Sequence, residues 1–208
     1  MLKGMESNYK VEVYGVSETN IFGKSYGEWT VLWWKWLLSV PAAINPLVDN
    51  NGQHAAVGQP SYVWFLAGSF PNYNREYPYR KTQVPVRRSI LFPVINCEAN
   101  ELEYPHLKSE SDVLEHVKKD MNSIVKKDCF INGKRIIPQR VPSDPQIFPL
   151  TIPDNNVIGV RGGNTSATSD GYWVFLKPLS KGQYTVRFEG SCELGRLNSG
   201  VIYELEIF

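Results

Sequence analysis

A period-two alternation of apolar and polar residues near the C-terminus restricts the fold more than any other feature of this chain. Residues 183–190 alternate aromatic or aliphatic side chains with polar ones, and residues 201–208 repeat the pattern. Such alternation is typical of a half-buried β-strand. Residues 171–178 are almost continuously apolar and predict a buried strand just before them. The chain therefore ends in a predicted meander of strands.

Four upstream segments also have the character of strands. Residues 9–16 alternate in the same way, and residues 146–152 predict a shorter strand. Residues 62–70 are short and continuously apolar, which is typical of a central strand buried on both faces. Residues 84–97 predict one or two strands. Because Pro93 has no N–H to donate, this strand should lie at a sheet edge or bend there.

One turn between strands has a specific signal. Asn132 and Gly133 lie between two apolar segments. Type I′ turns need positive φ at both central residues, and the Asn-Gly pair meets that need with little strain. We expect a two-residue β-hairpin at this position.

Helical periodicity replaces the strand pattern near the N-terminus. Residues 25–40 place Trp29, Trp33 and Trp36 on one helical face and further apolar residues on another. Apolar cover on two sides predicts a helix that is buried on two sides. The helix should end before Pro41, because a residue that precedes proline is disfavoured in the helical conformation.

A second, amphipathic helix is expected over residues 109–127, on the outside of the fold. Ser109 and Asp112 form a capping-box pattern at its start. Lys126 and Lys127 would complement the negative end of the helix dipole.

The composition favours a small β-rich domain. Six Trp, 11 Tyr and nine Phe accompany 16 Gly and 14 Pro, a balance that suits many short strands joined by turns. A chain of 208 residues fits one domain. No strand–helix–strand rhythm is present in the sequence. We therefore predict a mainly β, antiparallel β-sandwich or jelly-roll-like single domain, residues 1–208, with two accessory helices at about 26–40 and 110–127.

The charge balance argues against polyanionic partners. Lys and Arg total 22, Asp and Glu total 21, and the formal net charge is +1, so no nucleic-acid partner is expected. The longest nearly apolar segment, residues 29–44, is interrupted and shorter than the roughly 20 residues that a bilayer requires. The sequence as written has no export signal. A cytoplasmic location is expected on that basis, or secretion if a signal has been removed.

Metal and cofactor chemistry lacks its usual sequence marks. No Walker loop, GxGxxG, GxSxG or HExxH pattern is present, and no metal or cofactor is expected. The three histidines have no metal-binding spacing: they are His54, His106 and His116. The cysteines are odd in number and widely spaced: Cys97, Cys129 and Cys192. We expect them to be buried as small hydrophobic residues, with one disulfide bridge and a leftover thiol as the alternative.

Two acidic residues next to strongly apolar segments are candidates for catalysis. Glu98 follows the apolar part of residues 84–97, and Asp170 precedes the apolar segment 171–178. Desolvation at such positions shifts carboxyl pKa values. Adjacent strands can bring two carboxyl groups to the separation that glycoside hydrolysis requires. The alternative is that both acids are solvated or cap turns.

Two loops carry side chains that suit a polar ligand. In residues 73–81 tyrosines alternate with cations, a composition that stacks on sugar rings and holds anions. A glycine-rich loop at residues 161–166 could hold an anion on its backbone N–H groups. The candidate ligand-binding residues are Tyr73, Arg75, Tyr77, Tyr79, Arg80 and Arg161.

Several long motifs give the chain a resemblance to a group of hypothetical proteins. These are a YGxW…WWxW…SxP opening, a VWFLAG strand and a DGxWxFLxPLxxG ending, which together span residues 26–190. The resemblance implies one continuous domain. It assigns no activity and no catalytic residue.

Three functional hypotheses follow from these patterns. The leading one is a non-catalytic β-sandwich protein that binds a glycan or similar small polar ligand through loop aromatics. The second is a hydrolase or lyase that acts on a polysaccharide through Glu98 and Asp170. The third is a structural protein that assembles into homo-oligomers through its aromatic surfaces.

Overall fold

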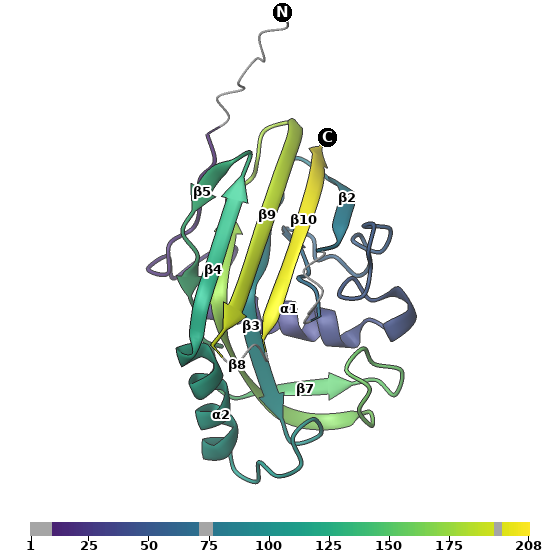
Figure 1. The fold of residues 1–208 in the computed structure, drawn as a ribbon, viewed down its shortest axis with the longest axis vertical. Helices are drawn as coiled ribbons and strands as arrows, with labels where there is room; N and C mark the ends of the chain where they lie inside the picture. The colour runs from purple at the N-terminus through teal and green to yellow at the C-terminus, as the bar shows by residue number, and fades with distance from the viewer. Residues whose placement is uncertain (1–9, 71–76, 194–196) are drawn as a thin grey trace, which may run out of the picture.

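Two β-sheets form the body of the molecule in the computed structural model, which describes residues 10–70, 77–193 and 197–208. The first sheet contains β1 (Val63–Phe65), β3 (Ser89–Asn100), β6 (Gln139–Arg140), β7 (Phe148–Ile152) and β8 (Gly163–Leu176). The second contains β2 (Tyr79–Val84), β4 (Ile124–Ile131), β5 (Lys134–Ile136), β9 (Gly182–Cys192) and β10 (Asn198–Ile207). The strand orders are β1-β3-β8-β6, with β7 also paired to β8, and β2-β10-β9-β4-β5. Figure 1 shows the second sheet in this order, from β5 on the left to β2 on the right.

This arrangement confirms the predicted mainly β, sandwich-like fold with two helices, and both sheets are mixed because each contains one parallel pair. β1 pairs with β3 in parallel, and β2 pairs with β10 in parallel. The reason is a crossover: after β1 the chain leaves the first sheet, forms β2 in the second sheet, and returns as β3. Two strands that are separated by such an excursion can run in the same direction.

The inner faces of the two sheets enclose the main core. Alternate residues of β3 point inward, and the Phe92 ring stacks on the Phe188 ring of β9 with centroids 4.8 Å apart. Tyr203 of β10 extends this stack. As predicted, the apolar residues of the alternating segments 183–190 and 201–208 lie on the strand faces that pack on the core.

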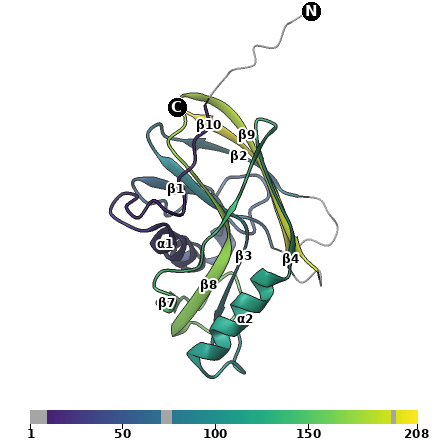
Figure 2. The same ribbon diagram turned by 90° about the vertical axis from the view of Figure 1, so that its left-hand side faces the viewer.

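The first helix, α1 (Tyr26–Ser39), covers the outer face of the first sheet (Figure 2). A capping box between Ser25 and Glu28 begins it, and Val40 ends it in an extended conformation before the following proline. Trp33 packs edge-on against Trp173 of β8 at 5.3 Å. Leu38, on another side of the helix, packs among residues of β7. The expected two-sided burial is confirmed.

The second helix, α2 (Glu110–Asn122), lies at the end of the molecule away from the C-terminus (Figure 2). Ser109 and Asp112 form the predicted capping box, and one face of the helix packs on β3. The helix ends five residues before the predicted residue 127, and β4 starts at Ile124. The β-branched pair at residues 124–125 favours a strand, so Lys126 and Lys127 lie in β4.

Three strand predictions need correction. Residues 10–16 make only an isolated bridge, through Val13, instead of a strand. β1 is a three-residue edge strand, not a central one, and its burial comes from α1 on its outer face. β8 extends back to Gly163, so Asp170 lies inside a strand and the glycine-rich loop is shorter than predicted. The predicted bend at Pro93 is confirmed as a β-bulge between Pro93 and Ile95.

Two further expectations can be compared with the described residues. The three cysteines are all buried and free, so the predicted burial is confirmed and the disulfide alternative is wrong. Neither α1 nor α2 combines the length and apolar character needed to traverse a bilayer, and these are the α-helices of the described ranges.

The predicted hairpin joins β4 to β5 through Asn132 and Gly133, whose φ angles are 48° and 76°. A Cβ added to Gly133 would touch nothing within 4 Å. We therefore expect Gly133→Ala to lower the free energy of unfolding by about 1 kcal/mol through backbone strain alone. Urea denaturation measures this loss. Gly15→Ala, which places a methyl group 3.6 Å from Ser17 at a residue without positive φ, is the control and should leave stability unchanged. Equal stability of the two variants would contradict the turn assignment.

Candidate functional site

A cavity of about 320 Å³ lies along the edge of β3, between α1 and the beginning of β10. β1 pairs with β3 only as far as Leu91. Beyond Pro93 this edge of β3 faces the cavity instead of a neighbouring strand in the described chain. The indole rings of Trp33 and Trp34 and the side chain of Leu38 form the wall on the α1 side. The cavity is thus mainly apolar, as small-molecule sites usually are.

Glu98 of β3 is the most buried acidic group that lines this cavity, with 6% of its surface exposed. Its Oε1 accepts a hydrogen bond of 2.9 Å from the Nδ2 of Asn100. Burial, with a smaller contribution from the nearby charge of Glu103, raises the pKa of Glu98 from 4.5 to about 8. The carboxyl group is therefore protonated at neutral pH, and it presents an O–H donor instead of a charge.

Asn100 connects Glu98 to a second acid. Asn100 is fully buried, and its Oδ1 accepts the backbone N–H groups of Leu102 and Glu103 at 2.9 and 3.1 Å. The turn after β3 is thereby folded back, and Glu103 also lines the cavity. One amide side chain therefore holds Glu98 and Glu103 on the same cavity.

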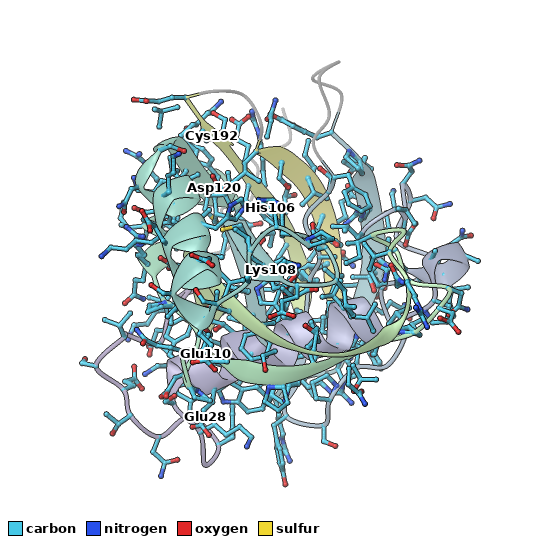
Figure 3. The ribbon with its side chains drawn as sticks, turned by 90° about the horizontal axis from the view of Figure 1, so that it is seen from below. Glu28, His106, Lys108, Glu110, Asp120 and Cys192 are labelled. Atoms are coloured by element: carbon cyan, nitrogen blue, oxygen red, sulfur yellow. The ribbon has the colours of Figure 1, made fainter. Side chains whose placement is uncertain are left out.

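Tyr104, which follows Glu103, also lines the cavity. Burial raises the pKa of Glu103, and a hydrogen bond from the Tyr104 hydroxyl opposes that rise. The Tyr104 ring packs against His116 of α2 with centroids 4.5 Å apart. Figure 3 shows the end of the molecule from below, with His106 and Lys108 on the loop that leads from this turn to α2. Packing on α2 thus holds Tyr104, and through it the Glu103 side chain, on the cavity.

Two donors on residues that line the cavity have no hydrogen-bond partner among the described residues. They are the Nε1 of Trp34 and the Nδ2 of Asn96. Both atoms are fully buried, so they do not face the open space of the cavity. Close packing holds Asn96 in place, because a Cβ on Gly171 would lie 2.6 Å from the Asn96 Cβ.

Glu98 and Asp170 are not brought together. Cys97 pairs with Asp170 and Glu98 pairs with Ser169. Paired residues share a face and successive residues alternate, so the two acids lie on opposite faces of the first sheet. Asp170 instead forms an ion pair with Arg140 at 2.7 Å, beneath α2. The proposed catalytic pair is therefore wrong, and the acid that shares the cavity with Glu98 is Glu103, which follows it closely in the sequence.

The predicted tyrosine-rich loop is only partly described. Tyr73 and Arg75 lie outside the described residues. Tyr77 is half-buried, and its ring is so close to Gly200 that a Cβ there would lie 2.5 Å from it. Tyr79 is 46% exposed and forms a hydrogen bond with Glu204. Of the two described tyrosines, Tyr79 is thus the more accessible.

Arg80 is a structural residue, which corrects its assignment to ligand binding. The side chain is 1% exposed. Its guanidinium donates to the Tyr203 hydroxyl and to backbone carbonyls of Leu47, Asp49, Ala67 and Gly68. The alternation along β2 places residue 80 on the inner side, where these acceptors converge. Arg161 is exposed in the loop before β8 and stays a candidate.

Comparisons with protein-family models, curated proteins and solved structures find no match for this chain. Within the described residues, no three His, Cys, Asp or Glu side chains are arranged to hold a metal ion. The account of the site therefore depends on the geometry of the cavity alone.

Replacement of Arg80 tests its structural role. Arg80→Met removes the guanidinium donor from the carbonyls of Leu47, Asp49 and Gly68, whereas that of Ala67 keeps the Tyr203 hydroxyl. We expect a loss of about 3 kcal/mol or more in the free energy of unfolding, or failure to fold. Arg161→Met is the matched control and should change stability by less than about 0.5 kcal/mol. Urea denaturation followed by circular dichroism makes the comparison. Similar midpoints for the two variants would refute the role of Arg80.

The raised pKa of Glu98 predicts a specific pH dependence. Between pH 4.5 and about 8 the folded state holds a proton that the unfolded state releases, so this group makes the free energy of unfolding fall as pH rises. Glu98→Gln removes that slope and should gain stability relative to the native protein by an amount on the order of 3 kcal/mol across the window. Glu101→Gln, at an exposed neighbour, should keep the native slope. Parallel profiles for native protein and Glu98→Gln would count against the assignment.

Proposed function

We propose that this protein binds a small molecule in the β3 cavity, and that the ligand has an apolar body and an oxygen acceptor. The observation that carries the proposal is a mainly apolar cavity of about 320 Å³ that is lined by the buried acid Glu98. An apolar wall with a few convergent polar groups is the usual composition of a ligand site. The protonated Glu98 supplies an O–H donor.

The protonated acid restricts the chemistry of the ligand. An oxygen atom that accepts the O–H of Glu98 satisfies a group whose burial without a partner costs about 1–3 kcal/mol. The apolar wall adds to the free energy of binding in proportion to the apolar ligand surface that it covers, at roughly 25 cal/mol per Å². A neutral ring with a carbonyl or hydroxyl group meets both requirements.

Glycan binding stays a prediction, with Tyr79 and Arg161 kept as candidate residues and Arg80 removed. Sugar rings also stack on indoles and accept hydrogen bonds, so a monosaccharide belongs to the ligand classes to be compared. Arg80 no longer supports a glycan site on the loop at residues 73–81, because it is buried. Tyr79 and Arg161 are accessible and retain that expectation independently of the cavity.

A cavity-filling variant tests the proposal. Ile158 lines the cavity, and Ile158→Trp would occupy its volume. Fragment binding is measured by ligand-detected NMR with small cyclic ketones, amides, alcohols and free monosaccharides. We expect at least one class to bind saturably, and Ile158→Trp to weaken that binding about tenfold or more, which corresponds to about 1.4 kcal/mol.

The control for this variant is Ile137→Trp, at a residue that is 68% exposed and outside the cavity. It should bind the same fragments as the native protein does. The proposal fails if no fragment binds saturably, or if Ile158→Trp and Ile137→Trp bind equally well.

A further inference from the structure

We infer that the groove between α2 and β8 binds a small, hydroxylated organic anion, with Arg140, Asn122 and Lys118 as donors to its acid group. The groove has a volume of about 800 Å³ and is lined by residues of α2, of the segment 140–146 and of β8. α2 lies beside β8 on the face of the first sheet that is opposite to Glu98 (Figure 2). The groove shares no lining residue with the β3 cavity, so it is a separate site.

Arg140 is held in one position by partners from other elements. Its Nε and Nη2 lie 2.8 and 2.7 Å from Oδ2 of Asp170, and its Nη1 donates to Oδ1 of Asn122 at 2.7 Å. The Tyr172 hydroxyl is a fourth partner. A guanidinium has five N–H groups, so at least one is left for a ligand. The side chain is 33% exposed and lines the groove, so the cation is in place before a ligand binds.

The acceptors next to Arg140 are already used. Asp170 accepts the backbone N–H of Gly171 at Oδ1 and Arg140 at Oδ2, and the ion pair neutralises its charge. Oδ1 of Asn122 accepts from Arg140, whereas its Nδ2, on an exposed residue, forms no hydrogen bond within the described residues. The polar atoms without a partner at this end of the groove are therefore N–H groups. They favour a ligand that supplies oxygen acceptors.

Lys118 adds a positive charge that has no counterion within the described part of the chain. It lies one turn before Asn122 on α2, so the two side chains share a face of the helix. It is exposed and forms no ion pair with a described residue. Three cations and two acids line the groove, which gives it a net charge of +1: Lys118, Lys119 and Arg140 against Glu115 and Asp170. The unneutralised charge attracts an anion.

The floor of the groove presents a hydroxyl group. Thr168 is 2% exposed, and its hydroxyl forms no hydrogen bond within the described residues. Unlike the unpaired hydroxyl of Ser169, it is not fully enclosed, so it is open to the groove. Ser143 accepts the Ser169 N–H at 3.2 Å and donates to the carbonyl of Gln146 at 2.9 Å, which fixes the segment that carries the Gln146 amide. These groups suit ligand hydroxyls next to an acid group on Arg140.

The size of the groove favours an organic anion over an inorganic one. A volume of about 800 Å³ is within the range of small-molecule sites and far exceeds the needs of a single ion. A guanidinium binds carboxylate and phosphate groups by charge-assisted hydrogen bonds. Two sources share this chemistry, a sugar acid and a sugar phosphate, and the experiment distinguishes them.

The experiment compares glucuronate, glucose 6-phosphate, glucose and inorganic phosphate by isothermal titration calorimetry on the native protein. We expect one or both sugar anions to bind with a Kd of about 1 mM or below. Glucose should bind at least about tenfold more weakly, because it forms no charge-assisted bond to Arg140. Inorganic phosphate should also bind more weakly, because it has no hydroxyl groups that reach Thr168. Added salt should weaken the binding of the sugar anions.

Four variants test the residues. Lys118→Gln should weaken the binding of the sugar anions about fivefold, whereas Lys134→Gln removes the same charge from an exposed residue of β5 and should bind them as the native protein does. Thr168→Val, which keeps the shape of the side chain, should weaken their binding about threefold or more. Arg140→Gln should reduce it below detection. Because this variant also breaks the ion pair with Asp170, its fold is checked by circular dichroism, and Lys118→Gln carries the test if it is unfolded.

Ile158→Trp separates this site from the β3 cavity. Ile158 lines the cavity and not the groove, so the variant should bind the sugar anions as the native protein does. The groove is not an anion site if neither sugar anion binds, or if glucose or inorganic phosphate binds as tightly as they do. Equal binding by Lys118→Gln and Lys134→Gln, or weaker binding by Ile158→Trp, would also overturn the inference. None of these results affects fragment binding in the β3 cavity, which is measured separately.

Discussion

The buried guanidinium of Arg80 fixes the course of the chain after β1, and the cavity along β3 exists because the chain takes that course. It binds the carbonyls of Ala67 and Gly68 directly after β1, and Ser69 then bonds to Ser199 of β10. These contacts draw the segment after β1 to the second sheet, so it does not continue beside β3. An open strand edge would otherwise expose unpaired backbone groups to solvent. Here α1 and the turns at both ends of the edge enclose it, and the cavity is the space that remains.

The chemistry of the cavity follows from that enclosure. A buried carboxyl group is more stable with its proton, which is why Glu98, with 6% of its surface exposed, has a raised pKa. Asn100 spans the distance to the turn that carries Glu103 and thereby satisfies the polar groups of a buried strand end. The same bonds that stabilise the end of β3 therefore place two acids of different proton affinity on one apolar cavity. The contacts that stabilise the fold at this point thus also shape the cavity.

Local patterns were enough to predict much of the fold, and long-range contacts decided the rest. The strands at residues 183–190 and 201–208 follow from alternation, and the Asn132–Gly133 hairpin follows from its φ requirement. The parallel pairing of β1 could not be read from its composition, because it depends on a crossover between sheets. Arg80 looked like a surface cation because its acceptors come from three segments that are distant in the sequence. Glu98 was found from its apolar neighbours. The face of the sheet on which Glu98 lies could not be predicted in the same way, because the bulge between Pro93 and Ile95 changes the alternation of faces along β3.

The proposed site depends on a buried, neutral carboxylic acid that lines the β3 cavity. The most direct test is a pH titration of the Glu98 side-chain carboxyl carbon by carbon-13 NMR in the native protein, with Glu98→Gln used to assign the resonance. The account predicts a midpoint near 8 and a carboxyl signal that is still in its protonated position at neutral pH. A midpoint close to the ordinary value of 4.5 would show that the group is solvated and charged, and would contradict the account.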